Sequence, residues 1–179
     1  MIYLFLAQGF EEIEAICPLD LLRRAGLEVK TVGVGGEIIT GAHGITVRAD
    51  ITASMYRDEN PEMIILPGGM PGTKNLDSSP VVDAALGAAV RCGGYLGAIC
   101  AAPSILGKRG LLKGKRAICY PGFEKYLDGA ILSDKRVVRD GKIITAAGPG
   151  VAFQFGLELI RAIKGNEAAE TVRTSTLAD

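Results

Sequence analysis

The sequence predicts an α/β fold in which helices cover both faces of a mainly parallel β-sheet. Short apolar runs typical of buried strands alternate along the chain with longer segments of helical periodicity. The 179 residues are 48% hydrophobic and include 24 glycines, a composition that suits a globular chain rich in turns. No internal repeat, low-complexity segment or linker divides the chain, so we expect a single domain over residues 1–179.

Each element is predicted from its local pattern and its flanking turn residues. The strands are expected at residues 2–7, 28–34 and 62–66, in the run that ends before Cys100, and at residues 116–120, 136–139 and 143–146. A further hairpin is expected from residues 37–40 and 45–48, and the loop at residues 67–72 is too rich in glycine for a regular element. The helices are expected from Glu11 to a cap at Gly26, at residues 80–91, directly after Cys100, and at residues 151–164 and 166–172, with helical turns at 54–57 and 123–127.

The charge pattern excludes several classes of partner. Twenty basic and twenty acidic side chains give a formal net charge of zero, so neither nucleic acid nor an anionic membrane is an expected partner. No apolar run reaches membrane-spanning length, and the N-terminal run lacks the basic start of a signal peptide. The four cysteines form no C-x-x-C pair or zinc spacing, so we expect reduced thiols, a cytoplasmic location and no metal. No Walker A or G-x-G-x-x-G loop follows a strand, and no cofactor is expected.

One cysteine stands at a predicted turn from strand to helix. Cys100 follows an apolar run and precedes Ala101, Ala102 and Pro103, and proline is favoured in the first turn of a helix. A side chain at such a turn projects toward a crevice, as in the nucleophile elbows of hydrolases, and helix N–H groups would favour its thiolate. The alternative is a buried cysteine of the core, the commoner environment of a free thiol.

The predicted loops after the strands converge on the same region. In parallel sheets, ligands bind at the carboxyl ends of the strands. Residues 8–14, 67–72 and 120–122 each follow a predicted strand, as does Cys100. We therefore expect them to share one rim with the cysteine.

Four segments together make the chain resemble the ThiJ/PfpI family, in the branch of the Parkinsonism-associated protein deglycase. The segments are Ala7-Gln8-Gly9-Phe10-Glu11-Glu12-Ile13-Glu14, Leu66-Pro67-Gly68-Gly69, Ala98-Ile99-Cys100-Ala101-Ala102-Pro103 and Gly148-Pro149-Gly150. The resemblance covers essentially the whole chain. It implies a flavodoxin-like three-layer sandwich of the class I glutamine amidotransferase-like kind, and a homodimer.

The resemblance also implies a set of site residues. Glu14 matches a glutamate that hydrogen-bonds the elbow cysteine, and a carboxyl beside a thiolate is expected to keep its proton. Gly69 and Ala101 match positions whose backbone N–H groups face the sulfur and a bound oxyanion. Gly68 is expected to line the same pocket. The alternatives are a solvated helix residue for Glu14 and a simple tight turn for the glycines.

The chain departs from the family pattern at one position. Many members carry a histidine where this chain has Tyr120, and a tyrosine is a poor base at neutral pH although it can donate a hydrogen bond. The single histidine, His43, lies in the predicted 41–44 turn, either as an exposed loop residue or at the rim of the pocket. A protease or other hydrolase that uses a cysteine–histidine pair is therefore disfavoured.

Two functional hypotheses follow. In the first, the chain is a weak, cofactor-independent enzyme of oxidative and carbonyl stress, with glyoxalase III-like or protein and nucleotide deglycase activity on small reactive carbonyls or glycated groups. The Cys100 thiolate would attack the aldehyde, Glu14 would transfer the proton, and the two backbone amides would stabilise the oxyanion. In the second, the chain is a non-enzymatic oxidative-stress sensor or chaperone in which Cys100 is oxidised to sulfinate.

Overall fold

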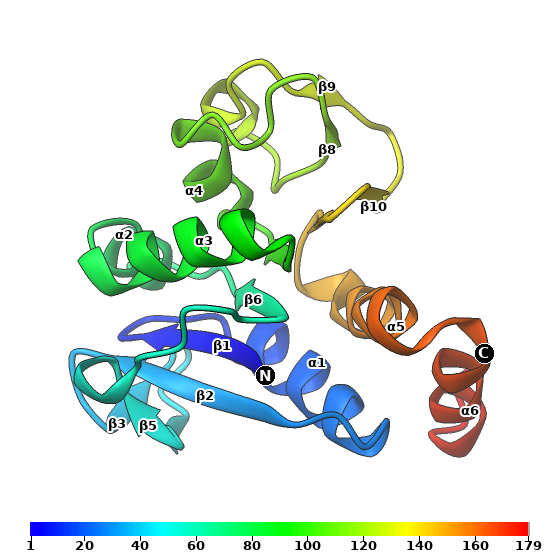
Figure 1. Ribbon diagram of the computed structural model, residues 1–179, viewed down its shortest axis with the longest axis horizontal. Coiled ribbons are helices and arrows are strands. Elements are labelled where there is room, and N and C mark those ends of the chain that lie inside the picture. Colours follow the sequence, from blue (N-terminus) through cyan, green and yellow to red (C-terminus); the bar gives the residue numbers. More distant parts are fainter. Residues whose placement is uncertain (179) are drawn as a thin grey trace.

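The central sheet has seven strands in the order β10-β11-β7-β6-β1-β2-β5 (Figure 1). The computed structural model describes residues 1–178. Neighbouring strands are parallel except β10 and β11, which form an antiparallel hairpin. The strands are β1 (Ile2–Ala7), β2 (Val29–Val34), β5 (Ile51–Thr52), β6 (Met63–Leu66), β7 (Tyr95–Ile99), β10 (Val137–Asp140) and β11 (Ile143–Ala146). The predicted mainly parallel sheet is confirmed.

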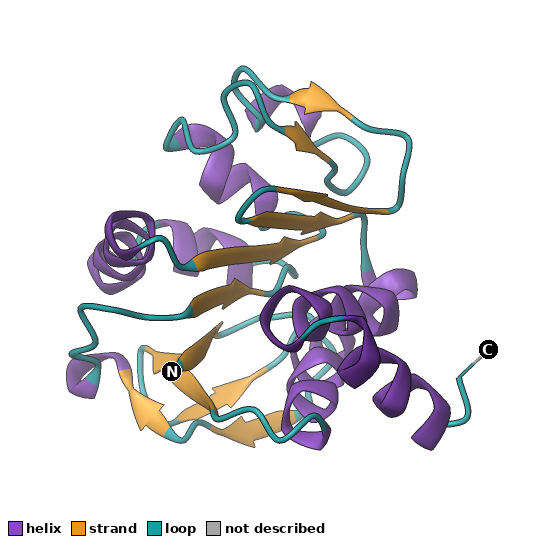
Figure 2. Ribbon diagram, turned by 45° about the vertical axis from the view of Figure 1, so that its right-hand side comes forward, coloured by secondary structure: helices purple, strands orange, loops and turns teal. Residues whose placement is uncertain are grey.

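Helices cover both faces of this sheet (Figure 2). They are α1 (Glu12–Arg24), α2 (Gly72–Asp77), α3 (Pro80–Cys92), α4 (Pro103–Lys108), α5 (Ala152–Lys164) and α6 (Asn166–Ser175). Alternate residues of β1 face opposite layers, as the period of a strand requires. Leu4 and Leu6 pack in the cluster with α1 and α5, whereas Tyr3 and Phe5 pack with α3 and α4. The three-layer, flavodoxin-like sandwich is therefore as predicted.

Short elements decorate the sandwich. The predicted hairpin forms from β3 (Ile38–Thr40) and β4 (Thr46–Arg48), and a second small sheet pairs β8 (Arg116–Ala117) with β9 (Ile131–Leu132). Single 3-10 turns lie at Ala53–Met55, Glu124–Tyr126 and Pro149–Val151. Among residues 1–178, no helix combines the length and apolar character needed to cross a lipid bilayer.

Two local predictions are corrected. The expected strand at residues 116–120 is only the two residues of β8, outside the main sheet, because the following backbone bonds elsewhere: Ile118 N–H donates to Thr145 Oγ1 (3.0 Å) and Tyr120 N–H to the Cys100 carbonyl (2.8 Å). The expected loop at residues 67–72 is followed directly by a helix that was not predicted, because α2 begins at Gly72. The N–H of Thr73 donates to the Gly69 carbonyl at 2.8 Å, so the loop itself supplies the first turn of that helix.

Candidate active site

Cys100 occupies a strained turn between β7 and α4. Its φ of +64° lies in the left-handed region, which a residue with a side chain rarely adopts. Two hydrogen bonds hold this conformation: Cys100 N–H donates to the Ala146 carbonyl (2.9 Å), and the Cys100 carbonyl accepts from Tyr120 N–H (2.8 Å). The predicted elbow is thus formed, with the thiol half-buried at the carboxyl end of β7.

The glycines of the β6–α2 loop allow other groups to approach the cysteine. A Cβ on Gly68 would lie 2.6 Å from Glu14 Oε2 and 2.7 Å from Cys100 Cβ, so no larger residue fits between the two side chains. Gly69 has a φ of +88°, and a Cβ at this position would overlap the backbone nitrogen of Glu11. The loop needs glycine at 68 for space and at 69 for both space and conformation.

Glu14 points from α1 into the interior and is fully buried. Its Oε2 accepts the Gly68 N–H at 2.9 Å, and the carboxyl also hydrogen-bonds the Cys100 side chain. Burial raises the pKa of Glu14 to about 7, although the hydrogen bonds of Cys100 and Gly68 act in the opposite direction; the Glu11 charge raises it further. Glu14 is therefore a protein-enclosed acid that titrates near neutral pH.

The Cys100 thiol does not have the low pKa expected from a helix start. Burial raises its pKa, the charge and hydrogen bond of Glu14 raise it further, and together they bring it to about 12. The backbone amides of Ala101 and Gly69 hydrogen-bond the sulfur and act the other way, but they do not outweigh burial. The first proton of the pair is therefore lost from Glu14 near neutral pH, and Cys100 is then a thiol beside a carboxylate.

Tyr120 lies at the rim of this site. Its backbone N–H donates to the Cys100 carbonyl, and its side chain is 46% exposed. The ring packs against Gly148, where an added Cβ would lie 3.2 Å from Cδ2 of Tyr120. The structure thus brings together Cys100, Glu14 and the backbone of residues 68, 69 and 101, with Tyr120 beside them.

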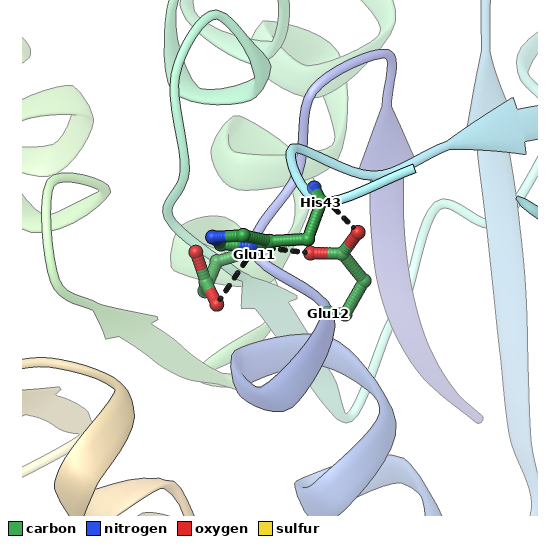
Figure 3. A group of neighbouring side chains, drawn as sticks. All are labelled: Glu11, Glu12 and His43. Carbon is green, nitrogen blue, oxygen red and sulfur yellow. Dashed lines mark hydrogen bonds and ion pairs between the residues drawn. The ribbon is translucent and has the colours of Figure 1, made fainter. Parts of the chain in front are cut away.

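His43 forms a separate cluster with two glutamates at the start of α1 (Figure 3). Its backbone N–H donates to Glu12 Oε1 (2.8 Å), and its Nδ1 lies 3.0 Å from Glu12 Oε2 and 3.6 Å from Glu11 Oε1. The N–H of Ile45 also donates to Glu12 Oε1 (3.3 Å). The buried carboxylate of Glu12 thereby fastens the β3–β4 loop to α1. Glu11, Glu12 and His43 are also close enough together, within the described residues, for one atom of each to bind the same cation.

The contacts within this cluster shift the pKa values of His43 and Glu12. The Glu12 hydrogen bond and the charges of Glu11 and Glu12 raise the pKa of His43, whose side chain is 67% exposed. Burial alone would raise the pKa of Glu12, but the hydrogen bonds from the His43 side chain and from the backbone amides of Glu12, His43 and Ile45 hold it below its ordinary value. Sequence reasoning placed His43 in a loop and missed Glu12 as its partner. The available signal was an acidic pair at a helix start facing a histidine in a predicted hairpin.

Fold and site together define a flavodoxin-like α/β protein with a cysteine at a nucleophile elbow and a buried acid beside it. The profile of the DJ-1/PfpI family matches residues 1–162, and the chain belongs to this family. The resemblance stated from the sequence motifs is therefore confirmed.

Relatives of known sequence and structure agree with this assignment. Protein dj-1beta of Drosophila melanogaster is 35% identical over 175 residues, which cover 96% of this chain and 94% of the relative. A Caenorhabditis elegans protein named glutathione-independent glyoxalase DJR-1.2 is 34% identical over 164 residues, covering 90% and 87%. The structure of oxidized Toxoplasma gondii DJ-1 superposes with a TM-score of 0.95 at 35% identity, covering 99% of this chain and 97% of that one.

Proposed function

We propose that this chain is a cofactor-independent enzyme that acts on small reactive carbonyl compounds through Cys100 and Glu14. The observation that carries the proposal is the fully buried Glu14 carboxyl beside a cysteine held at positive φ. The glyoxalase name of the Caenorhabditis elegans relative supports the substrate class. Removal of early glycation adducts from proteins or nucleotides is a related reaction of the same site.

The proposed reaction converts a 2-oxoaldehyde such as methylglyoxal to a 2-hydroxy acid. The Glu14 carboxylate takes the proton of the Cys100 thiol as the sulfur adds to the aldehyde carbon, the carbonyl π bond breaks, and Glu14 passes that proton to the oxygen. Glu14 then removes the proton from that carbon and returns it to the neighbouring carbonyl carbon through an enediol, while the proton of the new hydroxyl group moves to the neighbouring oxygen. The resulting thioester is hydrolysed by water, which releases lactate and restores the thiol. No oxidant is needed, because one carbon is oxidised as its neighbour is reduced.

The backbone amides of the site support the first step. The N–H groups of Gly69 and Ala101 already face the sulfur, so they lie where charge develops as the carbonyl oxygen becomes an oxyanion. Tyr120, at the rim, adds a phenol that can donate a hydrogen bond to bound substrate. The family histidine is replaced here by this tyrosine, so we expect slow turnover.

The test is lactate formation from methylglyoxal by purified protein. Cys100→Ser and Glu14→Gln should each lower kcat/KM by about 100-fold or more, the usual effect of losing a nucleophile or general acid–base group. Cys92→Ser is the matched control, because Cys92 is an exposed thiol at the opposite end of β7. Equal activity of wild type and Cys100→Ser would contradict the proposal.

A second candidate function is sensing of peroxide by the same cysteine. The amides that face the sulfur would also bind the oxygens of a sulfinate. A protonated Glu14 carboxyl, which already hydrogen-bonds the Cys100 side chain, would donate to one of those oxygens. The related Toxoplasma gondii structure is described as oxidized. Mild peroxide should add two oxygens to Cys100 alone by mass spectrometry. Equal oxidation of all four free cysteines would contradict this function.

We also propose a homodimer in the cytoplasm. The zero net charge offers little electrostatic resistance to association, and the outer face of α1 exposes Ile13 and Ile16, 54% and 39% accessible. The four free cysteines suit a reducing compartment. Sedimentation of wild type and Ile16→Lys tests the dimer: wild type should sediment at twice the chain mass and the variant at a lower mass.

A further inference from the structure

A cavity of about 590 Å³ lies at the edge of the sheet that is opposite to Cys100. One wall is the chain at residues 56–60, which leads into β6, and the other is the second part of α3, with Ala84, Ala88, Arg91 and Cys92. β6 and β7 are parallel, and these walls stand where both strands begin, whereas Cys100 follows the end of β7. The cavity is therefore separate from the proposed active site.

The cavity wall contains a buried hydroxyl group that lacks a partner. Tyr56 is 7% exposed, and its hydroxyl oxygen forms no hydrogen bond within residues 1–178. Edge-to-face contacts with Tyr3 and Phe5, at ring-centroid distances of 4.8 and 5.4 Å, hold the side chain in place. The hydroxyl lies close enough to Asp58 and Cys92 for their charges to act on it, and both residues line the cavity. The Tyr56 ring thus ends at the cavity.

This hydroxyl group is a hydrogen-bond donor. Burial raises the pKa of Tyr56, and the charges of Asp58, Tyr3 and Cys92 raise it further, so the phenol keeps its proton. A buried donor without an acceptor loses the energy of a hydrogen bond, and a ligand oxygen placed in the cavity would restore it. The hydroxyl therefore favours a ligand that brings an acceptor oxygen.

Two guanidinium groups on the cavity walls lack anionic partners as well. The ion pairs found in residues 1–178 include neither Arg57 nor Arg91. Arg57 donates to the Tyr56 carbonyl at 2.6 Å, so its guanidinium is held beside Tyr56. Arg91 Nη1 lies 3.2 Å from the place of an added Gly87 Cβ, so its side chain runs back along α3. Both groups are available to bind an oxyanion.

The two acidic residues of the wall do not pair with these cations. Asp58 accepts the Asn60 N–H at 2.8 Å and hydrogen-bonds the Tyr3 side chain, so its carboxylate is already engaged. Glu59 is exposed and forms no ion pair within the part of the chain that the structure describes.

The α3 wall also offers an apolar surface. Ala84 and Ala88 are one helical turn apart, and their small side chains leave room for a ligand to lie against the helix. The walls thus combine donors for an anion with a surface for an apolar body.

We propose that this cavity is a second ligand site, which binds a small organic oxyanion: a carboxylate or phosphate group on an apolar body. The oxyanion accepts hydrogen bonds from the Tyr56 hydroxyl and from the guanidinium groups of Arg57 and Arg91, and the apolar body lies against Ala84 and Ala88. Binding here forms no covalent bond and does not depend on the reaction proposed at the other edge of the sheet.

Three aromatic probes test the site. Benzoate and phenyl phosphate carry the two kinds of oxyanion, and benzamide is the neutral isostere of benzoate. Binding is measured as protection of Cys92 from iodoacetamide, followed by mass spectrometry, because this exposed thiol lines the cavity. Alkylation of Cys17, which lies on α1 outside the cavity, is the internal reference.

The wild-type protein should bind at least one of the two anions about tenfold or more tightly than benzamide, as expected for charge-assisted hydrogen bonds. Arg57→Gln and Arg91→Gln should each weaken that anion by about three- to tenfold. Arg48→Gln, a change on the β3–β4 hairpin to an arginine paired with Glu37, is the matched control and should leave its affinity unchanged. Glu59→Gln should strengthen its binding, because the substitution removes a negative charge from the wall.

Tyr56→Phe gives a result that a purely structural hydroxyl would not give. The substitution removes only the unpartnered hydroxyl, so the free protein should be as stable toward urea as wild type or more stable. Binding of the anion should nevertheless weaken by about three- to tenfold. A less stable free protein with unchanged anion binding would show that the hydroxyl has an internal partner and would overturn the inference.

Two further outcomes overturn it: benzamide that binds as tightly as both anions, or an anion preference that survives both arginine substitutions. The outcomes are distinguishable from those of the proposed function. Cys100→Ser leaves the cavity intact and should bind the anion as wild type does, whether or not it has lost lactate formation.

Discussion

The Gly68 amide donates to Glu14 Oε2 across 54 positions of sequence, at 2.9 Å, in a fully buried setting. This bond joins the β6–α2 loop to α1 and sets the carboxyl beside the cysteine. Burial raises the pKa of this carboxyl, and its hydrogen bonds with Cys100 and the Gly68 amide offset only part of that effect. The bond requires that residue 68 have no side chain.

Gly68→Ala should therefore damage both the fold and the site. The added methyl would stand 2.6 Å from Glu14 Oε2 and 2.7 Å from Cys100 Cβ, so the three groups must separate. We expect the free energy of unfolding to fall by about 2 kcal/mol, typical of overpacking, and methylglyoxal turnover to be lost. Urea unfolding and the lactate assay measure the two effects.

Gly87→Ala is the control for this substitution. Gly87 lies inside α3, where the nearest atom to an added methyl is the flexible end of Arg91 at 3.2 Å. Alanine at a helix interior should stabilise the protein by about 0.5–1 kcal/mol and leave turnover unchanged. If Gly68→Ala behaves like Gly87→Ala, the packing account of the site is wrong.

The raised pKa of Glu14 predicts a pH-dependent stability. The carboxyl has an ordinary pKa of 4.5 and a folded value of about 7, so the folded state holds the proton more tightly. Its contribution is fully present below pH 4.5 and is lost as the pH rises through about 7. This amounts to about 3 kcal/mol by linkage.

Glu14→Gln should remove this dependence. The amide is nearly isosteric, can still accept the Gly68 N–H and does not titrate. The unfolding free energy of wild type minus that of the variant should fall by about 3 kcal/mol between pH 4.5 and pH 8. A difference that stays constant across this range would show that Glu14 ionises in the fold as it does in water.

Much of the fold is predictable from the sequence because several central strands are short apolar runs next to turn residues, such as Met63–Leu66 before Pro67 and Tyr95–Ile99 after Gly94. The β10–β11 hairpin is signalled by Asp140-Gly141, and Pro80 marks the start of α3. The expected strand at 116–120 is wrong because its apolar residues signal burial but not which groups the backbone bonds. Ile118 finds a threonine hydroxyl instead of a strand partner.

The site is predictable where it follows local motifs and not where it depends on distant contacts. The elbow at Cys100 and the glutamate at position 14 follow from motifs within a few residues. The Glu12–His43 bond joins residues 31 positions apart, and no local periodicity encodes it. The direction in which the pKa of the Cys100 thiol shifts also depends on burial, which the helix-start argument did not include.

The positive φ of Cys100 predicts an unusual order of stability among variants. Alanine at position 100 keeps the Cβ that makes the left-handed region costly, whereas glycine adopts it freely. Both variants remove the thiol. Cys100→Gly should therefore be more stable than Cys100→Ala by about 1 kcal/mol, although glycine usually lowers stability. Thermal and urea unfolding of the pair measure the difference, and a more stable alanine variant would argue against a strained elbow.

The pairing of His43 with Glu12 can be tested by following the titration of the His43 ring by NMR. Because His43 is the only histidine in the chain, a single imidazole signal reports it. Its Hε1 resonance should titrate above the ordinary imidazole pKa of 6.5, since Glu12 and Glu11 both favour the charged ring. The stability from this pair is present below pH 6.5 and is lost as the pH rises through the folded pKa of His43. Glu12→Gln should return the NMR midpoint toward 6.5, whereas Glu37→Gln, a change to an exposed residue paired with Arg48, should not move it. A wild-type midpoint at or below 6.5 would mean that the His43 ring does not pair with Glu12 and Glu11 in solution.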